Sequence, residues 1–546
     1  MKNKLLRKVL AVSLAAAMMA GTGFTTAGQF VGTSVSVSAA ATFSYGDFDY
    51  QVNDDDTVTI TKYKGGDGTV TVPDKIDGKV VTKLADSSFN GITSLKNITL
   101  PETVKYIGND VFKNCTSLTG VTIPNSVISI GERAFLGCTG LVTAVLSDSL
   151  TTIGANAFEK CSTLKSIALP ETMTIINGSV FLDCTALKTV TIPDSITAIG
   201  NWAFGRCSSI TAITIPDSVR TIGESTFSDC AGLRNIVIPD SVTSMGKSAF
   251  QNCSSLRTAT LSDSLLLLNP SVFINCTSLR SITIPDSVIT IGDSAFSGCT
   301  SLAKVNMVDS VTTIGRNVFS NCISLEKITI PESVTAIGYE TFSGCTGLTN
   351  VVIEDGLIEI SDKLFLNCQS LQSVTMPESV KKIGNYSFSG CVGLTEITLP
   401  DSIKSIGEYA FDNCIGLTGF IIPNGVATIG SCAFKNCTGL TKFTISGSVA
   451  AIGEYAFYNC RGLTKLVIPD SVKSIGQYAF QYCSGLTSVT LPNGKGTISK
   501  GLFSNCTGLK SVTIPDSVTS INDYAFEYCS SMTEIKLSKN LTNIGQ

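Results

Sequence analysis

The chain has 546 residues, of which only 15% are charged, and it contains one Trp and no His. Without His, neither a Ser-His-Asp nor a Cys-His nucleophile can form and no imidazole ligand is available, although chemistry based on carboxylates alone stays possible. The 43 acidic residues against 39 basic ones are a poor match for nucleic acid or an anionic membrane, which both require a basic face.

Residues 1–41 predict an export signal that is removed from the mature protein. A basic start is followed by an apolar stretch from Val9 to Ala20 and by small residues up to Ala39–Ala41, which suit a signal peptidase. The apolar stretch is too short for a comfortable transmembrane helix, so we expect a secreted protein, extracellular or associated with the cell surface and without membrane insertion. The basic residues of this segment are Lys2, Lys4, Arg7 and Lys8, and their removal leaves a net charge of −8.

Residues 42–72 are expected to form a β-rich N-terminal cap. Alternating strand patterns, such as Val58-Thr59-Ile60 and Val70-Thr71-Val72, flank a turn-like stretch rich in Gly. The cap would cover the first coil of an array at residues 73–546. That array begins with a short insertion around Asp77-Gly78 and enters its register by Phe89.

The array has a strict period of 23 residues. Nineteen of the twenty Cys obey it, from Cys115 to Cys529, and Cys432 alone does not. A Phe precedes each periodic Cys by three residues, and the Phe column runs from Phe89 to Phe526. A fixed period of this length predicts a solenoid of about twenty units in which each unit is stable only when stacked on its neighbours.

Within one unit, Leu118, Val121 and Ile123 match the strand signature of leucine-rich repeats, and Pro124 ends the strand. A second apolar segment up to Ile130 predicts a strand on the opposite wall, so we expect two parallel β-sheets. The predicted core positions recur in every unit, and in the first two they are Phe112, Cys115, Leu118, Phe135, Cys138 and Leu141.

The remainder of the unit predicts a corner followed by a short helical turn. Gly131 stands at the corner, and its equivalents include Asn177 and Asn269, which also tolerate a left-handed backbone. Ala134 and Phe135 then share helical spacing with the following Cys.

The string Ile-Pro-Asp-Ser-Val-x-x-Ile-Gly-x-x-Ala-Phe-x-x-Cys-x-x-Leu resembles the repeat of BspA-like, or Treponema-type, leucine-rich-repeat proteins. Residues 282–302 and 466–486 show it well, and the resemblance covers roughly residues 73–546. It is highly specific for the fold and weakly specific for function. The resemblance implies an exported protein, typically bacterial, with an adhesive role toward host matrix proteins or other cells. It transfers no binding residues, because the consensus positions are core positions.

Two periodic columns admit more than one interpretation. The Cys column could be a disulfide framework, a metal site or core packing, and packing is favoured because adjacent units would place parallel Cβ vectors ~5 Å apart. Acidic residues after the Pro could hold Ca²⁺, but turn closure by bonds to their own backbone is simpler, so we expect no cofactor. This acidic column includes Asp194, Asp217, Asp240, Asp263, Asp286 and Asp309.

Two outward-facing columns are candidates for partner binding. Thr recurs on the strand face, as a solvated β surface that could also dock a partner, at Thr122, Thr191, Thr214, Thr283, Thr329 and Thr398. The residue before the core Ala-Phe pair becomes aromatic in later units, with further Tyr on the same face of the turn. This candidate partner-binding column comprises Trp202, Tyr386, Tyr409, Cys432, Tyr455, Tyr458, Tyr478, Tyr482, Tyr524 and Tyr528. The rings could instead merely cover the turns beneath them, and Cys432 could be a reactive thiol.

The sequence therefore favours an adhesin or protein–protein interaction scaffold. The alternative is a glycan-binding or cell-wall-associated structural protein, and an enzyme is not expected. The partner would be a host matrix or cell-surface protein, or a glycan, and not a nucleic acid. The sequence reaches Gln546 just before the next expected Ala-Phe pair, so the array is expected to be truncated or uncapped there.

Overall fold

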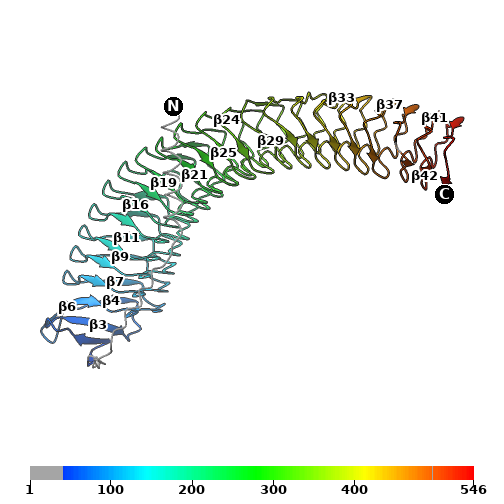
Figure 1. The fold of residues 1–546 in the computed structure, drawn as a ribbon. Coiled ribbons are helices and arrows are strands. Elements are labelled where there is room, and N and C mark those ends of the chain that lie inside the picture. Colours follow the sequence, from blue (N-terminus) through cyan, green and yellow to red (C-terminus); the bar gives the residue numbers. More distant parts are fainter. Residues whose placement is uncertain (1–40, 495) are drawn as a thin grey trace, which may run out of the picture.

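A computed structural model describes residues 41–494 and 496–546, in which the coils stack side by side along one curved axis (Figure 1). The two sheets are parallel and in register, with partners 23 residues apart, such as Ser129 with Thr152 and Ile282 with Val305. This confirms the predicted leucine-rich-repeat solenoid. The predicted export signal lies outside the described residues except for Ala41.

The first sheet forms the long-strand wall, whose strands have three or four residues and follow the core Leu of each coil. Two coils cross this wall without a strand of their own, and one of them pairs with the next through an isolated bridge between Ala212 and Asn235. The strands are β7 (Asn97–Thr99), β9 (Gly120–Thr122), β11 (Thr143–Val145), β13 (Ser166–Ala168), β15 (Thr189–Thr191), β18 (Asn235–Val237), β20 (Thr258–Thr260), β22 (Ser281–Thr283), β24 (Lys304–Asn306), β26 (Lys327–Ile330), β28 (Asn350–Ile353), β30 (Ser373–Thr375), β33 (Gly419–Ile421), β35 (Lys442–Thr444), β37 (Lys465–Val467), β39 (Ser488–Thr490), β41 (Ser511–Thr513) and β43 (Glu534–Lys536).

The second sheet forms the short-strand wall, in which each coil contributes two residues just before its corner. The second residue of nearly every pair is a buried Ile, Leu or Met, because alternation along a strand sends it inward. The strands are β8 (Tyr106–Ile107), β10 (Ser129–Ile130), β12 (Thr152–Ile153), β14 (Ile175–Ile176), β16 (Ala198–Ile199), β17 (Thr221–Ile222), β19 (Ser244–Met245), β21 (Leu267–Leu268), β23 (Thr290–Ile291), β25 (Thr313–Ile314), β27 (Ala336–Ile337), β29 (Glu359–Ile360), β31 (Lys382–Ile383), β32 (Ser405–Ile406), β34 (Thr428–Ile429), β36 (Ala451–Ile452), β38 (Ser474–Ile475), β40 (Thr497–Ile498), β42 (Ser520–Ile521) and β44 (Asn543–Ile544).

Six strands precede the regular coils. β1 to β3 are antiparallel, β3 is parallel to β6, and β6 continues into the short-strand wall at β8, while β4 pairs with β7 of the long-strand wall. The ring of Tyr63 in β3 stacks on Phe89 with the centroids 5.3 Å apart, so these strands cover the first core Phe. Their bounds are β1 (Phe43–Tyr45), β2 (Phe48–Val52), β3 (Val58–Tyr63), β4 (Thr69–Thr71), β5 (Lys75–Ile76) and β6 (Lys79–Leu84).

The third side of each coil, here called the turn wall, runs from the corner to the periodic Cys and is not helical. The described residues contain no helix, so the predicted short helical turns are wrong. Two residues of each turn have a left-handed backbone, for example Arg133 (φ 54°) and Gly137 (φ 73°), which interrupts a right-handed helix. Their amides therefore point toward the next coil, where Arg133 N–H donates to the carbonyl of Ala155 at 3.0 Å and Gly137 N–H donates to the carbonyl of Glu159 at 2.8 Å.

Gly is favoured at the corner for a different structural reason from the predicted one. Gly131 does not have a positive φ, so the expectation of a left-handed backbone at this position is wrong. A Cβ on Gly131 would instead lie 2.5 Å from the carbonyl carbon of Gly108 in the preceding coil. Where Asn replaces this Gly, its side-chain amide donates to a carbonyl of the preceding coil, as Asn177 does to Ile153 at 2.7 Å. Close approach of the coils therefore selects Gly here.

Phe and Cys columns fill the core. Consecutive Phe rings from Phe89 to Phe526 lie 5.0 to 5.7 Å apart, nearly all of them stacked. Each periodic Cys donates its thiol to the backbone carbonyl of the Phe 26 residues earlier, as Cys138 does to Phe112 at 3.0 Å. The six predicted core residues of the first units, Phe112, Cys115, Leu118, Phe135, Cys138 and Leu141, all have no exposed surface.

The Cys column consists of free thiols rather than disulfides within the described residues. Because burial disfavours the thiolate, it raises the pKa of Cys115 to about 11 and that of Cys299 to about 12. A protonated thiol is the form that donates to the Phe carbonyl. The column is thus a line of small apolar groups, each with one satisfied donor.

We expect alkylating reagents at mildly alkaline pH to leave the folded Cys column unmodified while they modify all twenty Cys in denaturant. The thiolate is the reactive species, and a pKa raised to about 12 at Cys345 leaves almost none of it. Mass spectrometry of peptides after a timed maleimide pulse measures this. Rapid modification of Cys345, or a disulfide between the Cys of neighbouring coils, would contradict the assignment.

Candidate binding surface

Most of the aromatic residues singled out from the sequence occupy one column of the turn wall, two residues after each corner, and the others, Tyr458, Tyr482 and Tyr528, lie three or four residues further along the same turn. Every residue of this column has a left-handed backbone, including Tyr386 (φ 55°) and Tyr455 (φ 54°). Non-Gly residues rarely adopt this conformation, and it is held here by a bond to the next coil. The amide of Tyr386 donates to the carbonyl of Glu408 at 2.8 Å.

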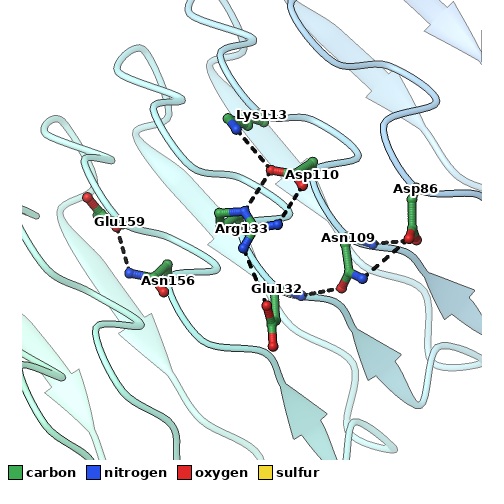
Figure 2. Close-up of polar contacts among 8 residues, drawn as sticks. All are labelled: Asp86, Asn109, Asp110, Lys113, Glu132, Arg133, Asn156 and Glu159. Atoms are coloured by element: carbon green, nitrogen blue, oxygen red, sulfur yellow. Dashed lines mark hydrogen bonds and ion pairs between the residues drawn. The ribbon is translucent and has the colours of Figure 1, made fainter.

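Near the N-terminal end, this column is occupied by charged residues that satisfy one another. Arg133 makes two 2.9 Å hydrogen bonds to the carboxylate of Asp110, which also pairs with Lys113 at 3.2 Å (Figure 2). The hydrogen bonds from Arg133 are the main reason that the pKa of Asp110 is lowered. Because their charges are already paired with one another, these side chains have few free hydrogen-bonding groups with which to bind a partner.

Beside them, a polar ladder closes the corners. The carboxylate of Asp86 accepts from the amide of Asn109 at 2.9 Å, and the side-chain oxygen of Asn109 accepts from the amide of Glu132 at 2.8 Å (Figure 2). Each bond joins one coil to the next.

From residue 386 onward the column becomes aromatic, and its rings pair between coils. Tyr386 stacks on Tyr409 with ring centroids 4.6 Å apart and planes 4° apart. Tyr455 stacks on Tyr478 at 5.2 Å and 7°. The coil spacing and the shared backbone conformation place the rings parallel, which is the offset geometry that aromatic pairs favour.

Cys432 separates these two stacked pairs. Its side chain is 5% exposed, and burial is the main cause that raises the pKa of its thiol. A hydrogen bond between the Tyr409 hydroxyl and this thiol is the main cause that raises the pKa of Tyr409 to about 12. A raised thiol pKa is opposite to what a reactive Cys requires, so the geometry gives Cys432 a packing role.

Lys435 bridges the gap left by Cys432. Its ammonium lies 5.7 Å from the ring centroids of both Tyr409 and Tyr458, within the range of cation–π attraction. Tyr458 in turn contacts Tyr455 edge-on at 5.8 Å and Tyr482 at 5.3 Å. The sequence prediction missed Lys435. Its contacts with Tyr409 and Tyr458 can be recognised only in the structure, where the small side chain of Cys432 separates the two Tyr pairs.

The rings therefore form one continuous surface, which we call the Tyr strip. It comprises Tyr386, Tyr409, Lys435, Tyr455, Tyr458, Tyr478 and Tyr482. Tyr482 is 39% exposed, and the column members of the strip are half-buried. Further along, Tyr524 is also 39% exposed and lies 5.6 Å from the Lys500 ammonium, and Tyr528 is 69% exposed.

Trp202 does not join this surface. It lies eight coils before Tyr386 in the same column. Its ring packs over Gly205, where a Cβ would lie 2.7 Å from the indole. The guanidinium of Arg206 lies 6.0 Å from the ring centroid. The alternative considered from the sequence, a ring that covers its own turn, describes Trp202 well.

Several residues of the acidic column after Pro connect coils rather than close their own turn. Asp240 accepts from the amide of Asp263 in the next coil at 2.9 Å. Ser287, which directly follows Asp286 of this column, donates its hydroxyl to the carbonyl of Leu265 in the preceding coil at 2.6 Å. The prediction of bonds to their own backbone is wrong for these residues, because coil stacking brings the next amide closer. Among residues 41–494 and 496–546 no cluster of acidic, Cys or His side chains has the geometry to hold a metal ion.

The sequence profile of the BspA-type leucine-rich-repeat region matches six overlapping stretches, which are residues 82–211, 152–280, 197–323, 267–392, 358–485 and 450–546. The chain belongs to this family. Comparison with curated proteins gives no match.

One solved structure shows the same fold. A leucine-rich repeat protein from Bacteroides ovatus is 26% identical, with a TM-score of 0.53, and the alignment covers 79% of this chain and 98% of that one. A leucine-rich cell surface protein from Faecalibacterium prausnitzii is 22% identical over 91% of this chain and 95% of that one, with a TM-score of 0.30.

Proposed function

We propose that this protein is an exported bacterial adhesin or interaction scaffold that binds a protein partner through the Tyr strip, and that it is not an enzyme. Membership of the BspA-type family supports a protein-interaction scaffold. The basic and apolar N-terminus of the sequence supports export to the cell surface or beyond. The described residues contain no helix with the length and hydropathy to span a bilayer.

The observation that carries the proposal is the continuity of the Tyr strip. Tyr rings are enriched at protein interfaces because they supply large contact area at little cost in side-chain entropy. Here mutual stacking between Tyr455 and Tyr478 already restricts their rotamers, so a partner would order few side chains on binding. The strip is therefore preorganised.

The same stacking favours a protein partner over a neutral glycan. Sugar rings stack on aromatic faces, but Tyr386 and Tyr409 cover one face of each other, as do Tyr455 and Tyr478. Each stacked ring therefore has at most one face left for a sugar, besides its edge and its hydroxyl group. These groups suit the polar and apolar mixture of a protein surface.

Replacing Tyr455 and Tyr478 together with Ala should weaken binding to the cognate matrix or cell-surface protein by about tenfold to a hundredfold, as expected for aromatic hot spots. Both rings are half-buried, so the thermal unfolding curve should move little. The measurement is surface plasmon resonance against a panel of purified extracellular-matrix proteins and neutral polysaccharides.

The matched control replaces Ser248 and Ser271 with Ala, because these residues occupy the same column with the same left-handed backbone. It should bind as the unaltered chain does. Equal binding by the Tyr variant and the control would contradict the proposal. Binding to a neutral polysaccharide that the Tyr variant abolishes would favour the glycan alternative instead.

A further inference from the structure

Basic side chains gather in one column of the long-strand wall, far from the Tyr strip. The column is the position directly after the core Leu of each coil. Over six consecutive coils it holds Lys165, Lys188, Thr211, Arg234, Arg257 and Arg280. We call these five cations with the intervening Thr211 the basic column.

The register of the coils places these side chains one above another. The amide of Lys188 donates to the carbonyl of Lys165 at 2.9 Å, and that of Arg257 to the carbonyl of Arg234 at 2.7 Å. The amide of Arg280 lies 3.4 Å from the carbonyl of Arg257. Three guanidinium groups therefore emerge from successive coils with the ~4.8 Å separation of paired strands at their base.

No carboxylate neutralises the basic column. All five cations are exposed, and none forms an ion pair with any carboxylate of the described residues. The acids directly before the periodic Cys of two of these coils have other partners, since Asp183 pairs with Arg206 at 3.6 Å and Asp229 accepts from the side-chain amide of Asn252 at 2.8 Å. Like charges on adjacent strands repel each other, so this arrangement costs stability without an anion.

The neighbouring outward columns are neutral and rich in hydroxyl groups. Over the same six coils they carry no acid and no aromatic ring, and they comprise Ser166, Thr189, Ala212, Asn235, Thr258 and Ser281, followed by Ala168, Thr191, Thr214, Val237, Thr260 and Thr283. Acidic residues follow only after the Pro that ends each strand, at positions such as Asp240. The surface is thus a line of cations beside a strip of hydroxyl and amide groups.

We propose that the basic column binds a linear acidic polysaccharide that lies along the axis of the array. Its sulfate or carboxylate groups would pair with Arg234, Arg257 and Arg280, since guanidinium groups bind such anions through two hydrogen bonds. Sugar hydroxyls would meet the Thr, Ser and Asn side chains alongside. A repeating polymer suits a surface whose charge repeats with every coil.

Other polyanions fit this surface less well. Proteins that bind single-stranded nucleic acid combine phosphate contacts with aromatic side chains on which the bases stack, and the three outward columns over these coils have no aromatic side chain. An acidic peptide that adds as a β-strand needs a free sheet edge, whereas here the neighbouring coils occupy the edges, since Arg234 N–H donates to the carbonyl of Thr211 at 3.1 Å and Arg257 N–H to that of Arg234 at 2.7 Å. The long-strand wall therefore favours a polymer that is recognised through its charges and hydroxyl groups.

The test uses the purified protein and immobilised heparin as the acidic polysaccharide, with dextran as its neutral counterpart. Replacing Arg234, Arg257 and Arg280 together with Gln should reduce heparin affinity by on the order of tenfold or more. The slope of log affinity against log salt should also become shallower, because fewer bound cations are displaced when fewer guanidinium groups engage. The unaltered protein should not bind dextran.

The matched control replaces Lys105, Lys381 and Lys510 with Gln. These exposed residues form no ion pair within the described residues and lie far apart along the array, so the control removes the same net charge without removing neighbouring cations. It should retain heparin binding nearly unchanged. An Arg→Lys version of the triple variant should keep part of the affinity and the same unfolding curve.

Three results would overturn the inference. Heparin affinity could be the same in the Gln triple variant and the unaltered protein, or it could fall equally in the control. Single-stranded DNA or poly-glutamate could displace heparin as well as free heparin does, which would show general attraction of polyanions. Because the basic column and the Tyr strip share no residue, the Arg variants should leave binding through Tyr455 and Tyr478 intact.

Discussion

Replacing Phe296 with Ala should lower the free energy of unfolding by about 3–5 kcal/mol. The ring has no exposed surface and stacks on Phe273 and on Phe319, with centroids 5.6 Å away on each side. Removing it leaves a cavity that neither neighbour can fill, because each is held by its own coil. Urea unfolding followed by circular dichroism measures the loss.

The appropriate control is Phe526→Ala, since Phe526 is half-buried and stacks only on Phe503, at 5.7 Å. We expect it to cost distinctly less than the central variant. Hydrogen exchange should show that the Phe296 variant loses protection in the coils around it before more distant coils. Equal costs for the two variants would mean that stacking on both sides contributes little.

The second large effect is expected at a corner. In Gly338→Ala the new Cβ would lie 2.5 Å from the amide nitrogen of Arg316 and 2.6 Å from the carbonyl carbon of Gly315, both of them backbone atoms of the preceding coil. Backbone atoms cannot move aside as a side chain can, so the coils must separate locally. We expect a loss of about 3 kcal/mol, at the upper end of what overpacking costs.

Two further variants isolate the cause. Gly447→Ala places its Cβ where nothing lies within 4 Å, and it should be neutral or slightly stabilising. Gly338→Asn should be milder than Gly338→Ala, because Asn269 in the same column donates its amide to the carbonyl of Met245 at 2.6 Å. If Ala is tolerated at 338 as well as at 447, close approach of the coils does not explain why Gly recurs at the corner.

The repeat made the architecture predictable, because a Cys at every 23rd residue leaves one way to bury all of them. The walls followed from alternation at positions such as Val121 and Ile123. The turn wall did not follow, because Ala134, Phe135 and Cys138 have the spacing of a helix whether or not the backbone is helical. The left-handed φ at Arg133 is what excludes a helix here, and the spacing of residues in the sequence does not reveal that φ.

The candidate surface was predictable in its members but not in its arrangement. The shared column of Tyr386, Tyr409, Tyr455 and Tyr478 can be read from the period. The pairing of these rings and the place of Lys435 depend on rotamers, which the sequence does not specify. The basic column was equally present in the sequence, but its significance depends on the absence of paired carboxylates around Arg234, Arg257 and Arg280 within the described residues.

The bonds between coils have a consequence for how such a protein can change over generations. Strand pairs join residues 23 apart, turn-wall amides reach carbonyls 22 residues ahead, and thiols reach carbonyls 26 residues back. A genetic deletion or duplication of one whole unit therefore rejoins surfaces that already fit. Gain or loss of a single residue would instead shift every later contact within that coil. The length of the array can thus change by whole coils, while the cross-section of the solenoid stays the same.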